Sequence, residues 1–437
     1  MKDFLRNLIP DRSPVRLFYH RVMAVAAAIY YRFPANQMTV IGVTGTNGKT
    51  TTCNLLHAIF MEAGQKTGML TTVNFKVGED SEVNLNKQTT LGPFLLQKKL
   101  RQMQEANCKI AIVEVTSHAM LQSRLWGVNV DTAVFTNLSQ DHFEYHGGAE
   151  AYREAKGLLF EHLNTSRRKP GVAKISVINQ DDIEADYFNR FPVDQRFEYG
   201  IQKGTYVARN LDAKPDGTQF TIRIPNGEVA VTFRIPGKMN VYNAIAAATV
   251  AVAHHINLNT IKQALERMKP VPGRVESIDE GQPYTVIVDY AHSEDSLEQL
   301  LSMLKELTER KLIVVFGATG GGRDKEKRPK MGAVVHKYAD TIVVADDDPY
   351  EEDRNLIASM IRTGIPREEG DGIWQVMDRK EAIRLALSLA KPGDTVAIAG
   401  KGGEEVQVIG KEKIPYDDRQ VVREVLARAV DIEVPRA

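Results

Sequence analysis

The run Gly42-Val-Thr-Gly-Thr-Asn-Gly-Lys-Thr-Thr51 combines glycines, a lysine and hydroxyl side chains in a spacing suited to holding phosphate. Gly45 and Gly48 allow backbone N–H groups to turn inward around phosphate oxygens, and a helix that begins here adds the positive end of its dipole. Lys49 would reach the β- and γ-phosphates, and the Thr50 hydroxyl would ligate Mg²⁺. The usual pattern has four residues between its first glycine and Gly-Lys-Thr, whereas five stand there in this chain, so the general motif fits loosely. The sequence predicts a nucleotide-phosphate loop, and the alternative is an ordinary glycine-rich turn.

Two further side chains could hold the cation that phosphoryl transfer requires. Glu114 lies at the end of the apolar run 110–115, and His142 follows the run 132–135. If both runs are parallel strands, both side chains lie at strand carboxyl ends, where open α/β sheets place their ligands. A lone histidine is more often a core or surface residue. The prediction of a metal site therefore depends on Glu114, His142 and the phosphate loop together.

Short apolar runs alternate with amphipathic stretches along the rest of the chain, and this alternation predicts parallel sheets with crossover helices. The runs that predict buried strands are 39–43, 110–115, 132–135, 175–178, 285–288, 312–316, 341–345 and 395–399. Residues 380–390 and 419–429 have helical periodicity. The stretch 205–235 is rich in β-branched residues and carries turn signals at Pro215-Asp216-Gly217 and Asn226-Gly227. We interpret it as antiparallel hairpins added to the first sheet.

The composition fits an ordinary globular protein of two or three domains. The 56 basic and 56 acidic side chains cancel, which gives no global charge signal for nucleic acid. Cys53 and Cys108 are the only cysteines, so a disulfide framework and a cysteine-rich zinc site are both excluded. We expect a cytoplasmic monomer.

The apolar run 22–31 is bracketed by Arg21 and Arg32. It is about half as long as the roughly 20 residues that a membrane-spanning helix needs, and no convincing signal-peptide cleavage site follows it. We expect a helix packed against the body of the protein. Contact with a membrane surface or a partner through residues 17–33 is the alternative.

Nine segments, spread in order over roughly 39–420, together resemble the Mur ligases, and most of all the MurE-type UDP-N-acetylmuramoyl-tripeptide synthetases. The segments are Gly45-Thr-Asn-Gly-Lys-Thr50, Glu114-Val-Thr-Ser-His118, Thr136-Asn-Leu-Ser-Gln-Asp-His142, Tyr152-Arg-Glu-Ala-Lys156, Asn240-Val-Tyr-Asn243, Gly273-Arg274, Asp289-Tyr-Ala-His292, Gly322-Arg-Asp-Lys-Glu-Lys-Arg328 and Gly400-Lys-Gly-Gly-Glu404. The resemblance implies an α/β fold. A central P-loop ATPase domain, with a mostly parallel sheet and appended antiparallel strands, would be followed by a C-terminal Rossmann-like domain. With Lys269-Pro-Val-Pro-Gly273 as the linker, we expect a helical segment at 1–38 and domains at 39–272 and 273–437.

The resemblance also implies roles for individual residues on the ATP side. Thr46, Asn47 and Thr51 join the glycines, Lys49 and Thr50 in holding the nucleotide, Asn243 resembles the adenine contact, and Arg274 and Asp289 resemble the linker arginine and the ribose-binding aspartate. Thr50, Glu114, His142 and Lys156 would hold Mg²⁺. Lys156 falls where the family has a lysine carboxylated by CO₂, and a carbamate offers two oxygens to a hard cation. Without the family, a solvated helix lysine is the simpler interpretation of Lys156.

On the substrate side, His292 would lie near the reacting centre with Lys49, Lys156 and Arg274. The positions that resemble the family's muramyl-peptide contacts are Thr89, Thr90, Thr116, Gln122 and Arg124, although ordinary loop polarity would also explain them. Arg323, Asp347, Asp348, Gly400 and Glu404 would contact the incoming amino acid. The implied reaction transfers the γ-phosphoryl group of ATP to a carboxylate, and the amine of a free amino acid then attacks the acyl phosphate.

The chain departs from the family in two places. Only 38 residues precede the first expected strand, which is too few for a UDP-binding domain with its own core, so we expect UDP on the acceptor to add little affinity. The diaminopimelate-adding enzymes carry Asn-Pro-Arg where this chain has Asp348, Pro349 and Tyr350. The missing arginine, with four acids at 347–352, favours a cationic amino acid such as lysine or ornithine over meso-diaminopimelate.

Three alternatives remain open at this point. Folylpolyglutamate synthetases share the two domains, but 289–292 and 400–404 look MurE-like. An archaeal pseudomurein ligase would also fit the short N-terminal segment. The third alternative is a non-catalytic nucleotide-binding subunit of a cell-wall assembly. Such a subunit would not need Lys49, Glu114, His142 and Lys156 together.

Overall fold

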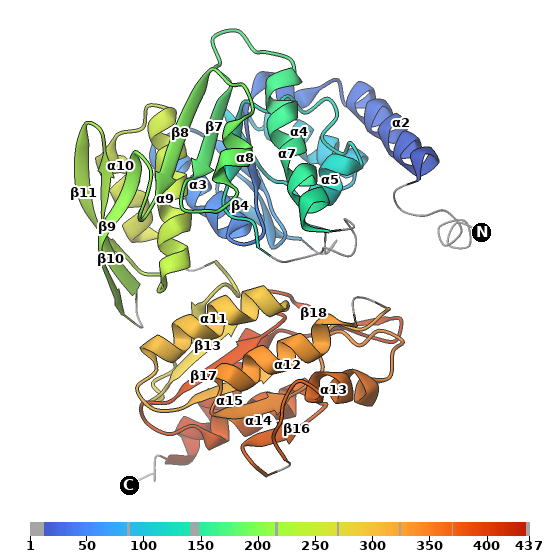
Figure 1. Ribbon diagram of the computed structural model, residues 1–437, viewed down its shortest axis with the longest axis vertical. Coiled ribbons are helices and arrows are strands. Elements are labelled where there is room, and N and C mark those ends of the chain that lie inside the picture. The colour runs from blue at the N-terminus through green and yellow to red at the C-terminus, as the bar shows by residue number, and fades with distance from the viewer. Residues whose placement is uncertain are drawn as a thin grey trace. The chain divides into compact units, whose positions relative to one another are not determined.

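The computed structural model describes residues 13–84, 88–139, 148–214, 217–268, 271–322, 325–368 and 370–433. Apart from residues 214–216, the chain divides into an N-terminal unit that extends to residue 268 and a C-terminal unit that begins at residue 269. Each unit has its own sheet with helices on both faces (Figure 1).

The N-terminal unit is built on an eleven-stranded sheet in the order β11-β10-β9-β8-β7-β6-β1-β5-β2-β3-β4. Its strands are β1 (Thr39–Thr44), β2 (Thr67–Leu70), β3 (Asn74–Val77), β4 (Asp80–Val83), β5 (Ile110–Glu114), β6 (Thr132–Phe135), β7 (Ile175–Asn179), β8 (Gln195–Gly200), β9 (Tyr206–Lys214), β10 (Gly217–Ile224) and β11 (Gly227–Phe233). Its helices are α2 (Pro14–Tyr30), the 3₁₀ helix η1 (Pro34–Gln37), α3 (Lys49–Glu62), α4 (Pro93–Glu105), α5 (Ser117–Leu121), α7 (Ala149–Thr165), α8 (Ala185–Asn189), α9 (Lys238–Ala253) and α10 (Leu258–Arg267). The strands from β2 to β8 along the order pair in parallel, so their carboxyl ends share one edge of the sheet.

Alternate residues of the central strands point to opposite faces and bury in two cores. Ile41 and Val43 of β1 pack with α3, α9 and α10, whereas Val40 packs on the other face with α4, α7 and α8. The alanine-rich α9 is buried along most of its length and packs against α3. Small side chains let the two helices approach closely, which fixes the start of α3 where the phosphate loop ends.

The C-terminal unit has a six-stranded sheet in the order β12-β13-β17-β14-β15-β16 and a separate β18-β19 hairpin. Its strands are β12 (Glu276–Ser277), β13 (Thr285–Asp289), β14 (Leu312–Phe316), β15 (Thr341–Val344), β16 (Ile373–Gln375), β17 (Thr395–Ala399), β18 (Val406–Ile409) and β19 (Glu412–Pro415). Its helices are α11 (Glu294–Leu307), α12 (Lys327–Tyr338), α13 (Arg354–Arg362), α14 (Arg379–Leu389) and α15 (Asp418–Glu433). The helices α11, α12 and α13 cover one face of the sheet, and α14 and α15 cover the other.

The predicted fold class is confirmed. Each predicted buried run is a strand within a residue or so, and β10 and β11 form an antiparallel hairpin whose turn contains Asn226. The turn signal at 215–216 lies outside the described residues. The prediction missed β2, β3 and β4 at one end of the sheet, because each has only four residues and β4, the edge strand, is exposed along its whole length.

The helix α2 packs against the body of the N-terminal unit, as expected. Ser13 caps it through the backbone N–H of Arg16, and Ala24, Ala27 and Ala28 bury one face against α4. No helix in the described part of the chain is long and apolar enough to cross a membrane.

Candidate functional site

The predicted phosphate loop connects the carboxyl end of β1 to the amino end of α3. Gly48 caps α3 with φ +81°, and a Cβ at this position would lie 2.1 Å from Oδ1 of Asn243, so only glycine fits there. The Lys49 ammonium donates to the Thr46 carbonyl at 2.7 Å. Thr51 is buried in the first turn of α3. The loop is therefore a tight cradle with Asn243, the predicted adenine contact, packed against it.

Asn137 holds this loop in shape, although the sequence analysis assigned it no role of its own. Its carbonyl accepts from the N–H of Thr46 at 2.8 Å, and its side chain accepts from the N–H of Asn47 (2.9 Å) and donates to the Asn47 carbonyl (3.0 Å). The Thr136 hydroxyl donates to the same carbonyl at 2.7 Å. Both residues follow β6 directly. Their place within a family segment and at a strand carboxyl end was the signal that could have identified them.

Glu114, at the end of β5, is buried and accepts three hydrogen-bonding groups on its Oε2. The Thr50 hydroxyl lies 2.9 Å from this oxygen, and the N–H and hydroxyl of Thr72 lie at 2.9 and 3.1 Å. The Thr72 hydroxyl is also 2.9 Å from that of Thr89. Thr72, which was not predicted, follows β2 at the same edge of the sheet. His142, the other predicted metal ligand, lies outside the described residues.

Lys156 lies in α7 with a buried side chain, so the interpretation of it as a solvated helix lysine is wrong. Its ammonium donates to the Gly45 carbonyl at 2.7 Å and lies 4.3 Å from the centroid of the Tyr152 ring. The Tyr152 hydroxyl is in turn 3.4 Å from the hydroxyl of Thr46. The fold therefore brings this lysine directly under the phosphate loop.

Four of the five residues predicted for the acceptor are joined by hydrogen bonds, and the fifth, Thr89, is next to Thr90 in the chain. Arg124 donates to the Thr90 carbonyl at 2.5 Å and, through Nε and Nη2, to Oε1 of Gln122 at 3.0 and 2.7 Å. The hydroxyls of Thr90 and Thr116 are 3.3 Å apart. Thr89 connects this group to Glu114 through Thr72. The arginine is thus held in a fixed orientation at the edge of the sheet that carries the phosphate loop.

In the C-terminal unit, Asp289 ends β13 and organises the residues around it. Its carboxylate accepts the N–H groups of Val275 at 2.7 Å and Ala291 at 2.8 Å. Burial raises the pKa of Asp289, and the nearby Arg274 guanidinium opposes that shift. The guanidinium lies 4.5 Å from the centroid of the Tyr290 ring, and its Nε has no hydrogen-bond partner among the described residues.

The segment 400–404 packs against the start of this unit. Gly400 donates its N–H to the Asp289 carbonyl at 3.0 Å. A Cβ on Gly273, whose φ is +64°, would lie 1.8 Å from the backbone nitrogen of Gly403. His292 Nδ1 is 2.8 Å from the Tyr290 carbonyl oxygen. The predicted residues Arg274, Asp289, His292 and Gly400 therefore form one region of the C-terminal unit.

The acids of the segment 347–352 are already paired with cations of the chain. Asp348 and Glu404 accept from Lys401 at 2.9 and 3.0 Å, and Asp347 lies 3.8 Å from the same ammonium. Burial alone would raise the pKa of Asp347, but Lys401 and Arg379 outweigh it and hold that pKa below its ordinary value.

The last two acids of the segment also have partners. Glu352 pairs with both terminal nitrogens of the buried Arg328, and Glu351 lies 3.3 Å from Lys411. The four acids that favour a cationic amino acid in the sequence analysis therefore already have cationic partners within the chain. Only the group of Asp347, Asp348 and Glu404 keeps more carboxylates than cations. Arg323 lies outside the described residues.

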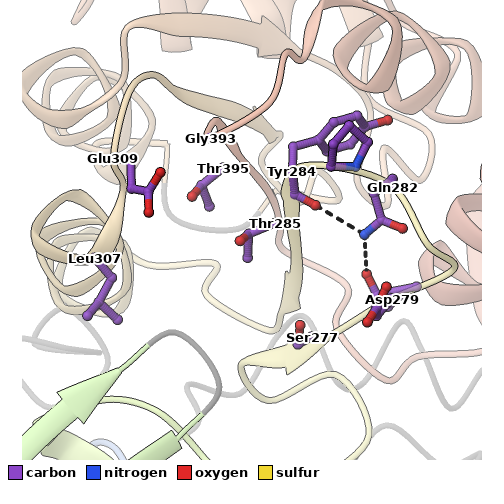
Figure 2. Close-up of a pocket in the computed structure, with 11 residues that line it drawn as sticks. Ser277, Asp279, Gln282, Tyr284, Thr285, Leu307, Glu309, Gly393 and Thr395 are labelled. Atoms are coloured by element: carbon purple, nitrogen blue, oxygen red, sulfur yellow. Dashed lines mark hydrogen bonds between the residues drawn. The ribbon is translucent and has the colours of Figure 1, made fainter.

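A cavity of 390 Å³ lies elsewhere in the C-terminal unit (Figure 2). Thr285 and Thr395, the first residues of β13 and β17, line it together with Ser277 and Glu309. The two strands are parallel, so this cavity is at the opposite edge of the sheet from Asp289 and Gly400. It is not part of the candidate site.

Comparison with known proteins agrees with this arrangement. Residues 43–251 match the Mur ligase middle domain, and residues 273–402 match the glutamate ligase domain of the Mur ligases. The chain is 42% identical over 406 residues to the UDP-N-acetylmuramoyl-L-alanyl-D-glutamate--2,6-diaminopimelate ligase of Geobacillus kaustophilus, a match that covers 92% of this chain and 82% of the relative. The chain belongs to the Mur ligase family. It is therefore an ATP-dependent acid–amino-acid ligase, as predicted, and Mur ligases in general depend on ATP and Mg²⁺.

Solved structures agree with the assignment. A UDP-N-acetylmuramoyl-L-alanyl-D-glutamate--2,6-diaminopimelate ligase, 32% identical, superposes with a TM-score of 0.62 over 90% of this Mur ligase and 79% of that chain. The folylpolyglutamate synthase of Mycobacterium tuberculosis has a TM-score of 0.70 and covers 95% of both chains. At 18% identity, that second likeness shows a shared fold only.

The residues of the N-terminal unit fit an ATP–Mg²⁺ complex. The phosphate loop leaves no room for a Cβ at Gly48, and a hydroxyl and a buried carboxylate, Thr50 and Glu114, stand together beside it. Both are oxygen ligands of the kind that Mg²⁺ prefers. Within the described ranges, no three His, Cys, Asp or Glu side chains gather in one place to hold a metal ion.

Proposed function

We propose that this Mur ligase couples a free amino acid to a muramyl-dipeptide-type acceptor through an acyl phosphate, in the synthesis of a peptidoglycan precursor. The observation that carries the proposal is a continuous set of hydrogen bonds. It joins the phosphate loop at Thr50 to Glu114, and from there to Thr72 and Thr89 beside the arginine of the acceptor group. Residues 39–272 would bind ATP and the acceptor, and residues 273–437 would bind the amino acid.

The chain's own residues account for the two steps. Arg124 would hold the acceptor carboxylate so that one oxygen faces the γ-phosphorus of ATP. That oxygen forms a bond to phosphorus as the bond to ADP breaks, while Lys49 and the loop N–H groups stabilise the transferring phosphoryl group. The amine of the amino acid then attacks the carbonyl carbon, loses a proton, and phosphate leaves. Mg²⁺, held at Thr50 and Glu114, would neutralise charge on the phosphates.

The decisive experiment is a ligation assay that crosses muramyl-peptide acceptors, with and without UDP, with candidate amino acids. Mass spectrometry reads the product. We expect a mass gain of one amino acid residue together with release of phosphate, only when ATP, acceptor and amino acid are all present. ATP hydrolysis that does not depend on the acceptor would contradict the proposal.

We further propose that Lys156 is carboxylated. In support, its side chain is buried beneath the phosphate loop, where a carbamate would add oxygen ligands to the two contributed by Thr50 and Glu114. Lys156→Ala should lower the ligation rate sharply, and a short carboxylic acid added to that variant should restore part of it. Lys262→Ala, on the exposed face of α10, is the matched control. Full activity of Lys156→Ala would exclude the carbamate from the mechanism.

For the incoming amino acid, we propose a side chain with an ammonium group, as in lysine or ornithine. Asp347, Asp348 and Glu404 share the single cation Lys401, which leaves two negative charges, and Glu404 is the most exposed of the three. Relatives that are named 2,6-diaminopimelate ligases favour meso-diaminopimelate as the alternative. Competition between lysine, ornithine, alanine and meso-diaminopimelate at equal concentration, compared by kcat/KM, decides between them. A tenfold preference for diaminopimelate, about 1.4 kcal/mol, would refute the ammonium proposal.

A further inference from the structure

The outer face of α2 is apolar and exposed. Eleven large apolar side chains are exposed in the described part of the chain, and six of them belong to this one helix. They are Val15, Phe18, Tyr19, Val22, Ile29 and Tyr30, which we call the α2 stripe. Phe18 and Tyr30 are 69% and 72% exposed, and the Tyr30 ring lies 6.5 Å from that of Phe94, another exposed aromatic residue. Such a concentration on one helix indicates an interaction surface.

The spacing of the stripe places it on a single face. At 3.6 residues per turn, its six side chains fall within an arc of about 120°. The buried alanines of α2 lie on the opposite side, against the body of the N-terminal unit. The helix is thus anchored by one apolar face while it presents a second one outward.

The charges around the stripe are positive. The helix α2 contains Arg16 and Arg21 and no acidic residue, and Arg32 follows it. Arg21 has no ion-pair partner among the described residues. Residues 1–35 hold six basic and two acidic side chains, whereas the whole chain is neutral. A second copy of this face would bring like charges together, but an anionic surface would complement them.

We propose that α2 binds the surface of an anionic phospholipid bilayer. The stripe enters the boundary between headgroups and acyl chains, with the helix axis in the plane of the membrane. Arg21 and Arg32 lie at the level of the headgroup phosphates, and their apolar stems cover the edge of the inserted face. The alanine face keeps the catalytic units attached to the membrane-bound helix.

Sedimentation of the full-length protein with lipid vesicles tests this proposal. The protein should bind vesicles that contain phosphatidylglycerol and should remain in solution with pure phosphatidylcholine, and high salt should release part of the bound protein. The double variant Phe18→Ser/Val22→Ser should weaken binding at least about tenfold, because two apolar side chains no longer enter the bilayer. Arg21→Gln should weaken it about fivefold. Ile183→Ser removes a side chain that is 92% exposed in the loop between β7 and α8, and should change nothing.

Three outcomes would overturn the proposal. Equal binding to both lipids would remove the role of charge, and unchanged binding by the double variant would remove the role of the stripe. A concentration-dependent dimer in light scattering without lipid, abolished by the double variant, would identify a second copy as the occupant. The variants should keep the wild-type melting temperature because the substituted side chains are exposed. Vesicle binding is measured without the ligation reaction. The membrane proposal can therefore be tested even if the ligation assay gives no product.

Discussion

The two units hold their candidate residues in place by different chemical means. In the N-terminal unit, Glu114 is oriented by hydroxyls and a backbone N–H, and Asn137 shapes the phosphate loop through amide groups. In the C-terminal unit, backbone N–H groups also hold Asp289, but Asp347, Asp348 and Glu404 are held by ion pairs with Lys401. Arg379 pairs with Asp418 with both side chains fully buried, and Lys401 lies among three carboxylates.

The difference predicts which charged groups serve the reaction and which stabilise the fold. Neutral groups position Glu114 without cancelling its charge, which stays available for a cation. Lys49 likewise donates to a carbonyl oxygen, and a phosphate would form a stronger, charge-assisted hydrogen bond with its ammonium. Buried ion pairs, by contrast, are costly to break, because removal of one partner strands the other charge in a poor solvent. Among the candidate residues and their partners, charge substitutions should therefore affect activity around Lys49 and folding around Lys401.

The largest expected effect is that of Lys49→Ala on the ligation rate. The substitution removes a cation from the transferring phosphoryl group, and we expect a loss of about 10²–10³-fold in kcat. The stability of the N-terminal unit should change by only about 1 kcal/mol, the usual value of one hydrogen bond such as that to the Thr46 carbonyl. Steady-state kinetics with a parallel urea titration measures both. A large loss of stability with retained activity would show that Lys49 stabilises the fold and is not needed for the reaction.

Lys401→Met should have the opposite profile. It leaves Asp348 and its neighbours buried without their cation, and we expect the C-terminal unit to lose about 3–5 kcal/mol of unfolding free energy. Lys411→Met is the matched control, because Lys411 is 86% exposed and its pair with Glu351 should contribute no more than about 1 kcal/mol.

The two tryptophans make this measurement specific to each unit. Trp126 lies in the N-terminal unit and Trp374 in the C-terminal one. A Trp126→Phe background therefore reports the unfolding of the C-terminal unit by fluorescence, and Trp374→Phe reports that of the N-terminal unit. Equal shifts for Lys401→Met and Lys411→Met would show that the buried cluster does not stabilise its unit.

The sequence was informative wherever the signal is local. The eight predicted strands are short apolar runs, and Lys49 and Glu114 stand in or beside recognisable segments, so all of these could be predicted from neighbours in the chain. Thr72 could not, because its contact with Glu114 spans 42 residues and requires β2 and β5 to be paired. The role of Lys401 was hidden for the same reason, since its partner Asp348 is 53 residues away. Counting acids in one segment therefore overestimated the charge that the segment presents.

Lys156 shows a different limit. A lysine in a helix is usually exposed, and only the family resemblance drew attention to this one, although its neighbours Ala155 and Gly157 are buried with it. The fold explains the burial, because α7 packs across the sheet and directs this side chain to the Gly45 carbonyl.

The smallest predicted effect is the loss of stability at acidic pH, which we expect to be larger in the N-terminal unit than in the C-terminal unit. Burial lowers the pKa of His57 and of His254 to about 4, and both lie in the N-terminal unit. In the unfolded chain each has a pKa near 6.5, so the unfolded state binds more protons between pH 6.5 and 4. Above about pH 6.5 both histidines are neutral in both states and do not reduce the unfolding free energy of the N-terminal unit. As the pH falls to about 4, each histidine lowers that free energy by about 1–3 kcal/mol.

The C-terminal unit should resist acid over the same range. Hydrogen bonds from Arg328 lower the pKa of Glu352, a residue of this unit, to about 2. This carboxylate therefore stays ionised and paired until the pH falls well below 4. Unfolding followed through Trp126 should therefore shift with pH between 6.5 and 4, while unfolding followed through Trp374 should shift less. His57→Gln and His254→Gln keep a hydrogen-bonding group without a titrating one, so together they should flatten the pH dependence of the N-terminal unit. If the C-terminal unit unfolds first on acidification, its ion pairs are weaker than their burial implies and the contrast between the units fails.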